Sequence, residues 1–306
     1  MAGTGTVNRE SHKVLFDRTF DEIKAEKDQV PIQGKMFFSE VKSPRLDYKM
    51  GTVSKTLDLP VRSEDEDDLP MVEPVVGFNK TFNLLNYRSG VKVTRKMVEL
   101  DQYSLISTLL SGLLDSANRK REYQYADVFN SGFTDTGADA VALFSNSHPH
   151  ADAAGGVWDN LEATSDLTSD SYSTMRLNMR NRTGEKGFIA PRNLNRLVVC
   201  AEKERKAVEV MGSSHTAENQ LNNIFAFSGE SEVVVWDWLT STTAWFGQDK
   251  MADALEQGLY EFIQAPVDIA DATGDFGIDI IMAKRLRFTN AVGATILKAW
   301  NGNVGA

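Results

Sequence analysis

A long run of helical periodicity between Met97 and Phe129 constrains this chain more than any other stretch. Apolar side chains recur there every three or four residues with polar residues between them, which is the pattern of an amphipathic helix. Thr94 precedes the run as a candidate N-cap, and Ser131-Gly132 supplies a stop. One such helix would extend for about 50 Å. The sequence therefore predicts a single long spine, although an ordinary buried helix has the same periodicity.

The residues before the helix, 37 to 94, alternate between apolar and polar side chains, as β-strands do. Two extended arms, near 46 to 61 and 75 to 85, flank a run of acids. Adjacent carboxylates repel one another and do not enter a core. We predict a two-stranded projection with an acidic tip, and an isolated ribbon of this kind needs a further surface for stability. The acidic residues are Glu64, Asp65, Glu66, Asp67 and Asp68.

The amino-terminal segment contains a short amphipathic stretch between residues 13 and 24. Phe16, Phe20 and Ile23 share one helical face, and charged residues fill the rest. A short helix with one apolar stripe cannot bury that stripe by itself. We expect it to dock on this subunit or on the next one.

The remainder of the chain mixes helices and strands without the regular βαβα alternation of a doubly wound sheet, so the predicted fold class is α+β. Two strands near 278 to 282 and 286 to 288 form either a pair or one long bent strand. The other predicted elements are a strand at 140 to 144, a helix at 169 to 181, a strand at 196 to 200, a helix at 201 to 211 and a strand at 232 to 239.

Charge and composition exclude several classes of protein. The chain has 33 basic and 43 acidic residues and a net charge of −10, which argues against a surface that grips phosphate backbones. Its lone cysteine, Cys200, cannot form an internal disulfide, which fits a reducing cytoplasm. There is no bilayer-spanning apolar stretch and no recognisable export signal. We expect a folded protein without a membrane partner.

We find no catalytic constellation in the sequence and expect neither an enzyme activity nor a cofactor. His148-Pro149-His150 is the one arrangement that suggests a metal, but zinc needs a third ligand, and a turn at the base of a loop is the favoured interpretation. Trp236, Trp238 and Trp245 are able to stack on bases, yet their hydrophobic setting favours core packing.

Four motifs in a fixed order carry a resemblance to a known family. They are Gly90-Val91-Lys92-Val93-Thr94-Arg95-Lys96, Val141-Ala142-Leu143-Phe144-Ser145-Asn146-Ser147-His148-Pro149, Leu197-Val198-Val199 and Ala244-Trp245-Phe246. With the order of elements around them, they resemble the major capsid proteins of tailed bacteriophages, which have the Hong Kong 97 fold, and most closely the Mu-like major head subunits. Relatives often have prolines after the third motif, where this chain has Cys200-Ala201.

The resemblance implies a domain organisation and a function. It implies a structural protein that assembles from pentamers and hexamers into an icosahedral shell around a double-stranded DNA genome, without sequence-specific binding. Portal and scaffold proteins are implied partners, the virion is the implied location, and assembly occurs in the host cytoplasm. The implied parts are an amino-terminal arm (1–36), an extension loop (37–88), a peripheral domain with the spine helix (89–189), an axial domain (190–265) and a return to the peripheral domain (266–306).

Three other functions remain open at this point. One is an encapsulin-like nanocompartment shell, another is a tail or baseplate protein, and the third is a metal-dependent hydrolase that uses His148 and His150. Within the shell interpretation, we also predict a charge contact between neighbouring subunits. The acidic tip of one subunit would lie over Arg119, Lys120 or Arg121 at the far end of the next subunit's helix.

Overall fold

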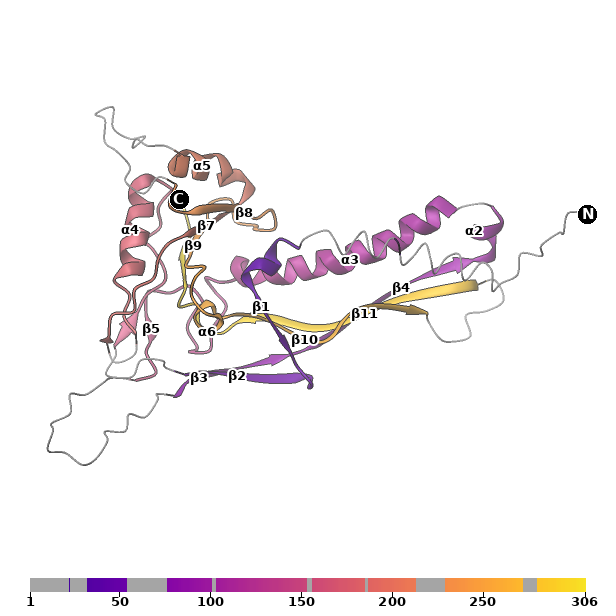
Figure 1. Cartoon of the computed structure of the whole chain (residues 1–306), viewed down its shortest axis with the longest axis horizontal. Helices are drawn as coiled ribbons and strands as arrows, with labels where there is room; N and C mark the ends of the chain where they lie inside the picture. Colours follow the sequence, from indigo (N-terminus) through magenta and orange to yellow (C-terminus); the bar gives the residue numbers. More distant parts are fainter. Residues whose placement is uncertain are drawn as a thin grey trace, which may run out of the picture.

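A computed structural model describes Glu22 and residues 32–53, 76–100, 103–152, 156–184, 187–212, 229–271 and 280–306. A long arm projects from a thicker body (Figure 1). The elements are η1 (Gly34–Phe37), β1 (Ser39–Lys42), β2 (Asp47–Val53), β3 (Val76–Asn83), β4 (Leu85–Thr94), α2 (Arg95–Glu99), α3 (Tyr103–Asn130), β5 (His148–Pro149), β6 (Val157–Trp158), α4 (Ser169–Arg180), β7 (Arg196–Val199), η4 (Ala201–Lys203), α5 (Glu204–Gly212), β8 (Glu232–Val235), β9 (Trp245–Gln248), α6 (Ala254–Gln257), β10 (Leu259–Asp271), β11 (Ile280–Ala294) and β12 (Trp300–Asn303).

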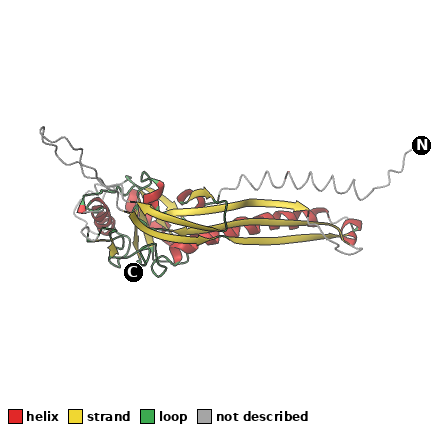
Figure 2. Cartoon of the chain, turned by 90° about the horizontal axis from the view of Figure 1, so that it is seen from below, coloured by secondary structure: helices red, strands yellow, loops and turns green. Residues whose placement is uncertain are grey.

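The arm consists of a four-stranded sheet, which we call the long sheet, with α3 lying along it. Its strand order is β1-β10-β11-β4, with β10, β11 and β4 antiparallel and β1 parallel to β10. Leu286 and Phe288 of β11 pack against Leu113 and Ala117 of α3. Figure 2 shows the strands running alongside most of α3. The apolar stripe of the helix therefore covers one face of this sheet.

The predicted single helix is wrong at its amino-terminal end, because the structure divides it into α2 and α3. Met97 of α2 and Ile106 of α3 both pack around Val93 of β4. Nine residues separate Met97 from Ile106, and in a straight helix that spacing would put them on opposite sides. The break lets both side chains reach one cluster. The predicted cap is confirmed for α2, where the Met97 amide donates to Thr94 Oγ1 at 3.4 Å.

The body contains the second sheet, of order β12-β9-β7-β8, with α4 and α5 packed on it. The predicted helix at 169 to 181 is confirmed as α4, which begins at a capping box made by Thr168 and Ser171. Tyr172, Met175 and Met179 bury one face of α4 in the same cluster as the β7 side chains. Both α4 and β12 therefore belong to the body.

The two-stranded ribbon exists, because β2 and β3 pair antiparallel. The ribbon does not depend only on another subunit for its stability, because it packs on the long sheet of its own subunit. The rings of Tyr48 and Phe82 lie 4.8 and 4.7 Å from the Phe262 ring on β10. Gly293 of β11 leaves room for this contact, because a Cβ there would lie 2.6 Å from a ring carbon of Phe82. The acidic tip lies outside the described residues.

Two further differences from the sequence predictions are local. The predicted strand at 140 to 144 is a loop with one bridge between Thr136 and Ala142, and its buried Leu143 and Phe144 explain the apolar pattern. Near 278 to 288, the alternative of one long strand is confirmed by β11. β8 ends at Val235, so the tryptophans that follow it lie beyond the strand. No helix in the described ranges is long and apolar enough to cross a membrane.

Candidate functional site

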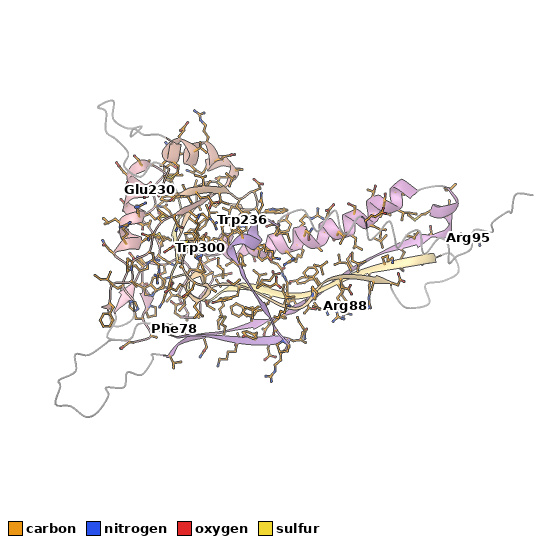
Figure 3. All side chains as sticks on the ribbon, viewed as in Figure 1. Phe78, Arg88, Arg95, Glu230, Trp236 and Trp300 are labelled. Atoms are coloured by element: carbon orange, nitrogen blue, oxygen red, sulfur yellow. The ribbon has the colours of Figure 1, made fainter. Side chains whose placement is uncertain are left out.

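The arm and the body meet at an aromatic cluster that we call the junction, made by Phe37, Phe129, Trp236 and Trp300. The Phe37 ring centre lies 6.2 Å from that of Phe129 on α3, 5.1 Å from Trp236 after β8 and 5.5 Å from Trp300 on β12. Figure 3 labels Trp236 and Trp300, which lie where α3 enters the body. One side chain from the start of the chain therefore joins the spine helix to the second sheet.

A buried carboxylate fixes the segment that carries Phe37. The Gly34 amide donates to Glu122 Oε2 of α3 at 3.0 Å. Burial raises the pKa of Glu122, and the hydrogen bond from Gly34 acts in the opposite direction. Gly34 is also tightly enclosed, since a Cβ there would lie 2.7 Å from Tyr125 Cβ. These contacts attach η1 firmly to the spine helix.

The sequence predicts Arg121 to be an exposed cation that contacts the acidic tip, but the structure places it in a buried ion pair. Its Nε and Nη2 atoms donate to the two carboxylate oxygens of Glu261 at 3.0 and 2.7 Å, and both side chains are largely buried. The Tyr125 hydroxyl donates to Glu261 Oε2 at 2.5 Å, and Asn290 Nδ2 donates to Oε1 at 3.1 Å. Burial, followed by the Glu261 charge, raises the pKa of Tyr125. Arg121 therefore ties α3 to β10 and is not available at the surface.

The helical period explains this correction. Arg121 lies one turn after Ala117, which already faces the long sheet, so position 121 also points inward. The signal that sequence reasoning missed is Glu261, an acid within the apolar strand Leu259–Asp271 that requires a buried partner. Arg119 and Lys120 are exposed, and Lys120 Nζ lies 5.4 Å from the centre of the Tyr87 ring. Their contact with the acidic tip of a neighbouring subunit stays a prediction.

His148 and His150 are both buried, and both ring nitrogens of His148 contact polar side chains of the fold. His148 Nδ1 lies 2.6 Å from Asp139 Oδ2, and Nε2 lies 3.0 Å from Asn160 Oδ1. Its ring stacks on Trp158 at 4.4 Å. His150 Nε2 lies 3.5 Å from Thr183 Oγ1. In the part of the chain that the structure describes, no group of three or more His, Cys, Asp or Glu side chains is placed to hold a metal ion.

The remaining predicted site residues divide into two groups. Trp236 and Trp245 are fully buried, as expected for core side chains, and the half-buried Trp238 packs edge-on against Tyr123. Cys200 is buried and is not part of a disulfide, and burial raises the pKa of its thiol. Several predicted contact residues lie outside the described residues. These are Phe16, Phe20 and Ile23 of the amino-terminal segment and Glu64, Asp65, Glu66, Asp67 and Asp68 of the acidic tip.

Exposed apolar side chains mark the surfaces available for association. Leu105 and Leu109 are adjacent on α3 and are 44% and 36% exposed. Leu46 and Val76, at the two ends of the ribbon, are also exposed. These side chains lie on the arm and the ribbon, away from the junction.

Comparisons with known proteins identify the fold and the family. The capsid of the native GTA particle superposes with a TM-score of 0.55 at 11% identity, covering 89% of each chain. The procapsid of bacteriophage JBD30 gives 0.54 at 11% identity, covering 96% of this chain and 75% of that one. Microbacterium phage Oxtober96 gives 0.54 at 12% identity, with 89% and 90% covered. The predicted α+β capsid fold of the Hong Kong 97 type is therefore confirmed.

Sequence comparison gives the family. No curated protein sequence matches the chain. The profile described as "Phage capsid protein" matches residues 80–299, which include α3, strands β7, β8 and β9 of the second sheet and strands β4, β10 and β11 of the long sheet. The finer likeness to Mu-like head subunits stays a prediction. The chain belongs to the phage capsid protein family and is a structural major capsid protein.

Proposed function

We propose that copies of this chain assemble through pentamers and hexamers into a closed icosahedral shell around double-stranded phage DNA. The observation that carries the proposal is the long arm, whose exposed Leu105 and Leu109 run along the side of α3. Burying apolar area contributes roughly 25 cal/mol per Å². Because contacts in rings and shells are head-to-tail, each copy presents its arm to one neighbour and receives another.

The parts of the subunit have separate roles in this proposal. The long sheet with α3 acts as the peripheral domain, the second sheet as the axial domain that gathers at the symmetry axes, and the ribbon with its acidic tip as the extension loop. The amino-terminal segment with Phe16, Phe20 and Ile23 docks on the same or the next subunit. The packaged DNA is enclosed without sequence-specific recognition, in keeping with the net charge of −10.

The proposal includes partners and a location beyond the subunit itself. A portal protein would provide the opening for DNA, a scaffold protein would set the size of the shell, and assembly would take place in the host cytoplasm before the virion forms. The subunit's role is structural. Support for this comes from the polar clusters at His148 and Glu261, which are satisfied by neighbouring side chains within the fold.

Electron microscopy of the purified chain tests this proposal. We expect closed shells, and particles taken from the producing host should contain DNA. Tubes would favour a tail component, and shells that enclose a protein cargo would favour a nanocompartment. A chain that stays monomeric as its concentration is raised would contradict self-assembly.

A further inference from the structure

Lys80 of β3 lies on the face of the ribbon that packs against its own subunit. Side chains alternate between the two faces of a strand, so Lys80 shares a face with Phe82, whose ring packs 4.7 Å from Phe262. The Lys80 Nζ atom lies 5.8 Å from the centre of the Phe82 ring. Figure 3 labels Phe78, two residues earlier on β3, beneath the body. Lys80 is therefore half-buried, whereas Lys49 of β2 is exposed.

Lys80 binds the body at a second point, apart from the aromatic contact. Its Nζ atom donates to the carbonyl oxygen of Thr136 at 2.8 Å. Thr136 belongs to the loop between α3 and β5, and it forms a bridge with Ala142 in the same loop. The Ala138 amide donates to Thr295 O, just after β11, at 3.0 Å. Because the loop is tied on both sides, the acceptor for Lys80 has a defined position.

Two carboxylates stabilise the Lys80 ammonium group in this partly dehydrated position. Burial lowers the pKa of Lys80, and the charges of Asp135 and Asp139 oppose that shift. Asp139 is itself buried, and its Oδ2 lies 2.6 Å from His148 Nδ1. An apolar side chain of similar length would pack on Phe82 without the cost of dehydrating an ammonium group. What the lysine adds is a directional contact.

Two separate contacts fix the direction of the ribbon, whereas one does not. Apolar burial is non-directional, so the aromatic packing on Phe262 alone lets the ribbon turn about that point. The hydrogen bond from Lys80 lies two residues nearer to the acidic run, which is about 7 Å along the strand. Val76, four residues beyond Lys80, is 72% exposed. A turn of about 10° at Phe82 would move Val76 by roughly 3–4 Å.

We propose that Lys80 is a positioning residue that fixes the direction of the ribbon and thereby the geometry of the shell. The inference rests on the self-assembly proposed above. In head-to-tail association, the rotation that relates neighbouring subunits decides whether a ring closes or an open assembly continues. The ribbon is a separate two-stranded layer beneath the long sheet (Figure 1), so its direction can change without breaking either larger sheet.

Lys80→Met tests the proposal in the full-length chain, because methionine keeps an apolar stem and removes the charge and the donors. Below the concentration at which shells form, amide hydrogen exchange in β2 and β3 should become about tenfold faster, equivalent to about 1.4 kcal/mol. The melting temperature should change by about 2 °C or less, because methionine still packs on Phe82. At assembling concentrations, electron microscopy should show shells of mixed diameter or open sheets in place of shells of a single diameter.

Two matched variants make the result specific. Lys80→Arg keeps the charge and the hydrogen-bond donors, so it should retain slow exchange and a single shell diameter. Lys49→Met removes an exposed lysine from the opposite face of the same ribbon and should behave as the wild type in both measurements. A change in Lys80→Met alone separates a positioning role from a general loss of charge on the ribbon.

Contrary results would overturn the inference. Lys80→Met shells with the wild-type diameter would do so, as would the same alteration in Lys80→Arg or in Lys49→Met. A lower melting temperature with unchanged shells would show that Lys80 contributes only stability. A wild-type chain that forms no shells would contradict the proposed function and with it the effect on shell geometry, while the hydrogen-exchange comparison would still decide whether Lys80 anchors the ribbon.

Discussion

Replacing Phe37 with alanine should weaken the junction between the arm and the body. Phe37 is only 4% exposed and touches rings on α3, after β8 and on β12. Truncating a buried phenylalanine costs about 3–5 kcal/mol. With an unfolding entropy of about 2.1 cal/mol/K per residue over 306 residues, this free energy corresponds to a fall in melting temperature of roughly 5–8 °C. The cost is large because neither the helix nor the sheet can supply another side chain there.

Met36→Ala is the matched control for Phe37→Ala. Met36 is the preceding residue, belongs to the same short helix and is 51% exposed, so its loss should change stability by less than about 0.5 kcal/mol. Urea unfolding gives the free energies, and tryptophan emission gives a local readout because Trp236 and Trp300 both contact Phe37. We expect a red shift for Phe37→Ala only. Equal unfolding free energies and emission spectra for the two variants would refute the reasoning.

Three further predictions concern other contacts. Glu261→Gln should cost about 3–5 kcal/mol because it leaves the Arg121 charge buried, and adding Arg121→Met should recover part of that loss in a double-mutant cycle of urea unfolding. Burial raises the pKa of Glu122 above its ordinary value of 4.5, so the stability of the wild type relative to Glu122→Gln should decrease as the pH rises above 4.5. Thermal melts of both proteins across pH measure this, and a difference in melting temperature that does not change with pH would contradict it. Gly293→Ala should push Phe82 and the ribbon off the long sheet, and hydrogen exchange should increase in β2 and β3 but not in β10.

The sequence alone was sufficient to predict helices and strands whose signals come from residues close together in the chain. The alternation around Tyr48 and Phe82 identified the strands of the ribbon, and the 3.6-residue period identified α3 and α4. Thr94 was recognisable as a cap from its position before a helical run. These signals depend on side chains a few residues apart, so they do not require knowledge of the rest of the fold.

Interpretation of single residues failed where the partner lies far along the chain. Arg121 looks like an exposed cation in its own helix, and only Glu261, 140 residues away, makes it a buried one. The apolar residues Leu143 and Phe144 are as hydrophobic as a strand, but they enter the core from a loop. Met97 continues the helical period by sequence, yet it packs with Ile106 only because the helix breaks between them.

The sequence by itself therefore determined which side chains leave water, which segments are helical or extended, and, through the order of its motifs, the capsid family. Only the tertiary structure decided which buried groups meet. The position of Arg88 beside Arg285 and Arg287 is set by the register between β4 and β11, two strands that are nearly 200 residues apart at these positions. Hydrophobic burial is non-directional and can be read from composition and period, whereas hydrogen-bond register and ion pairing are directional and exist only once distant segments have come together.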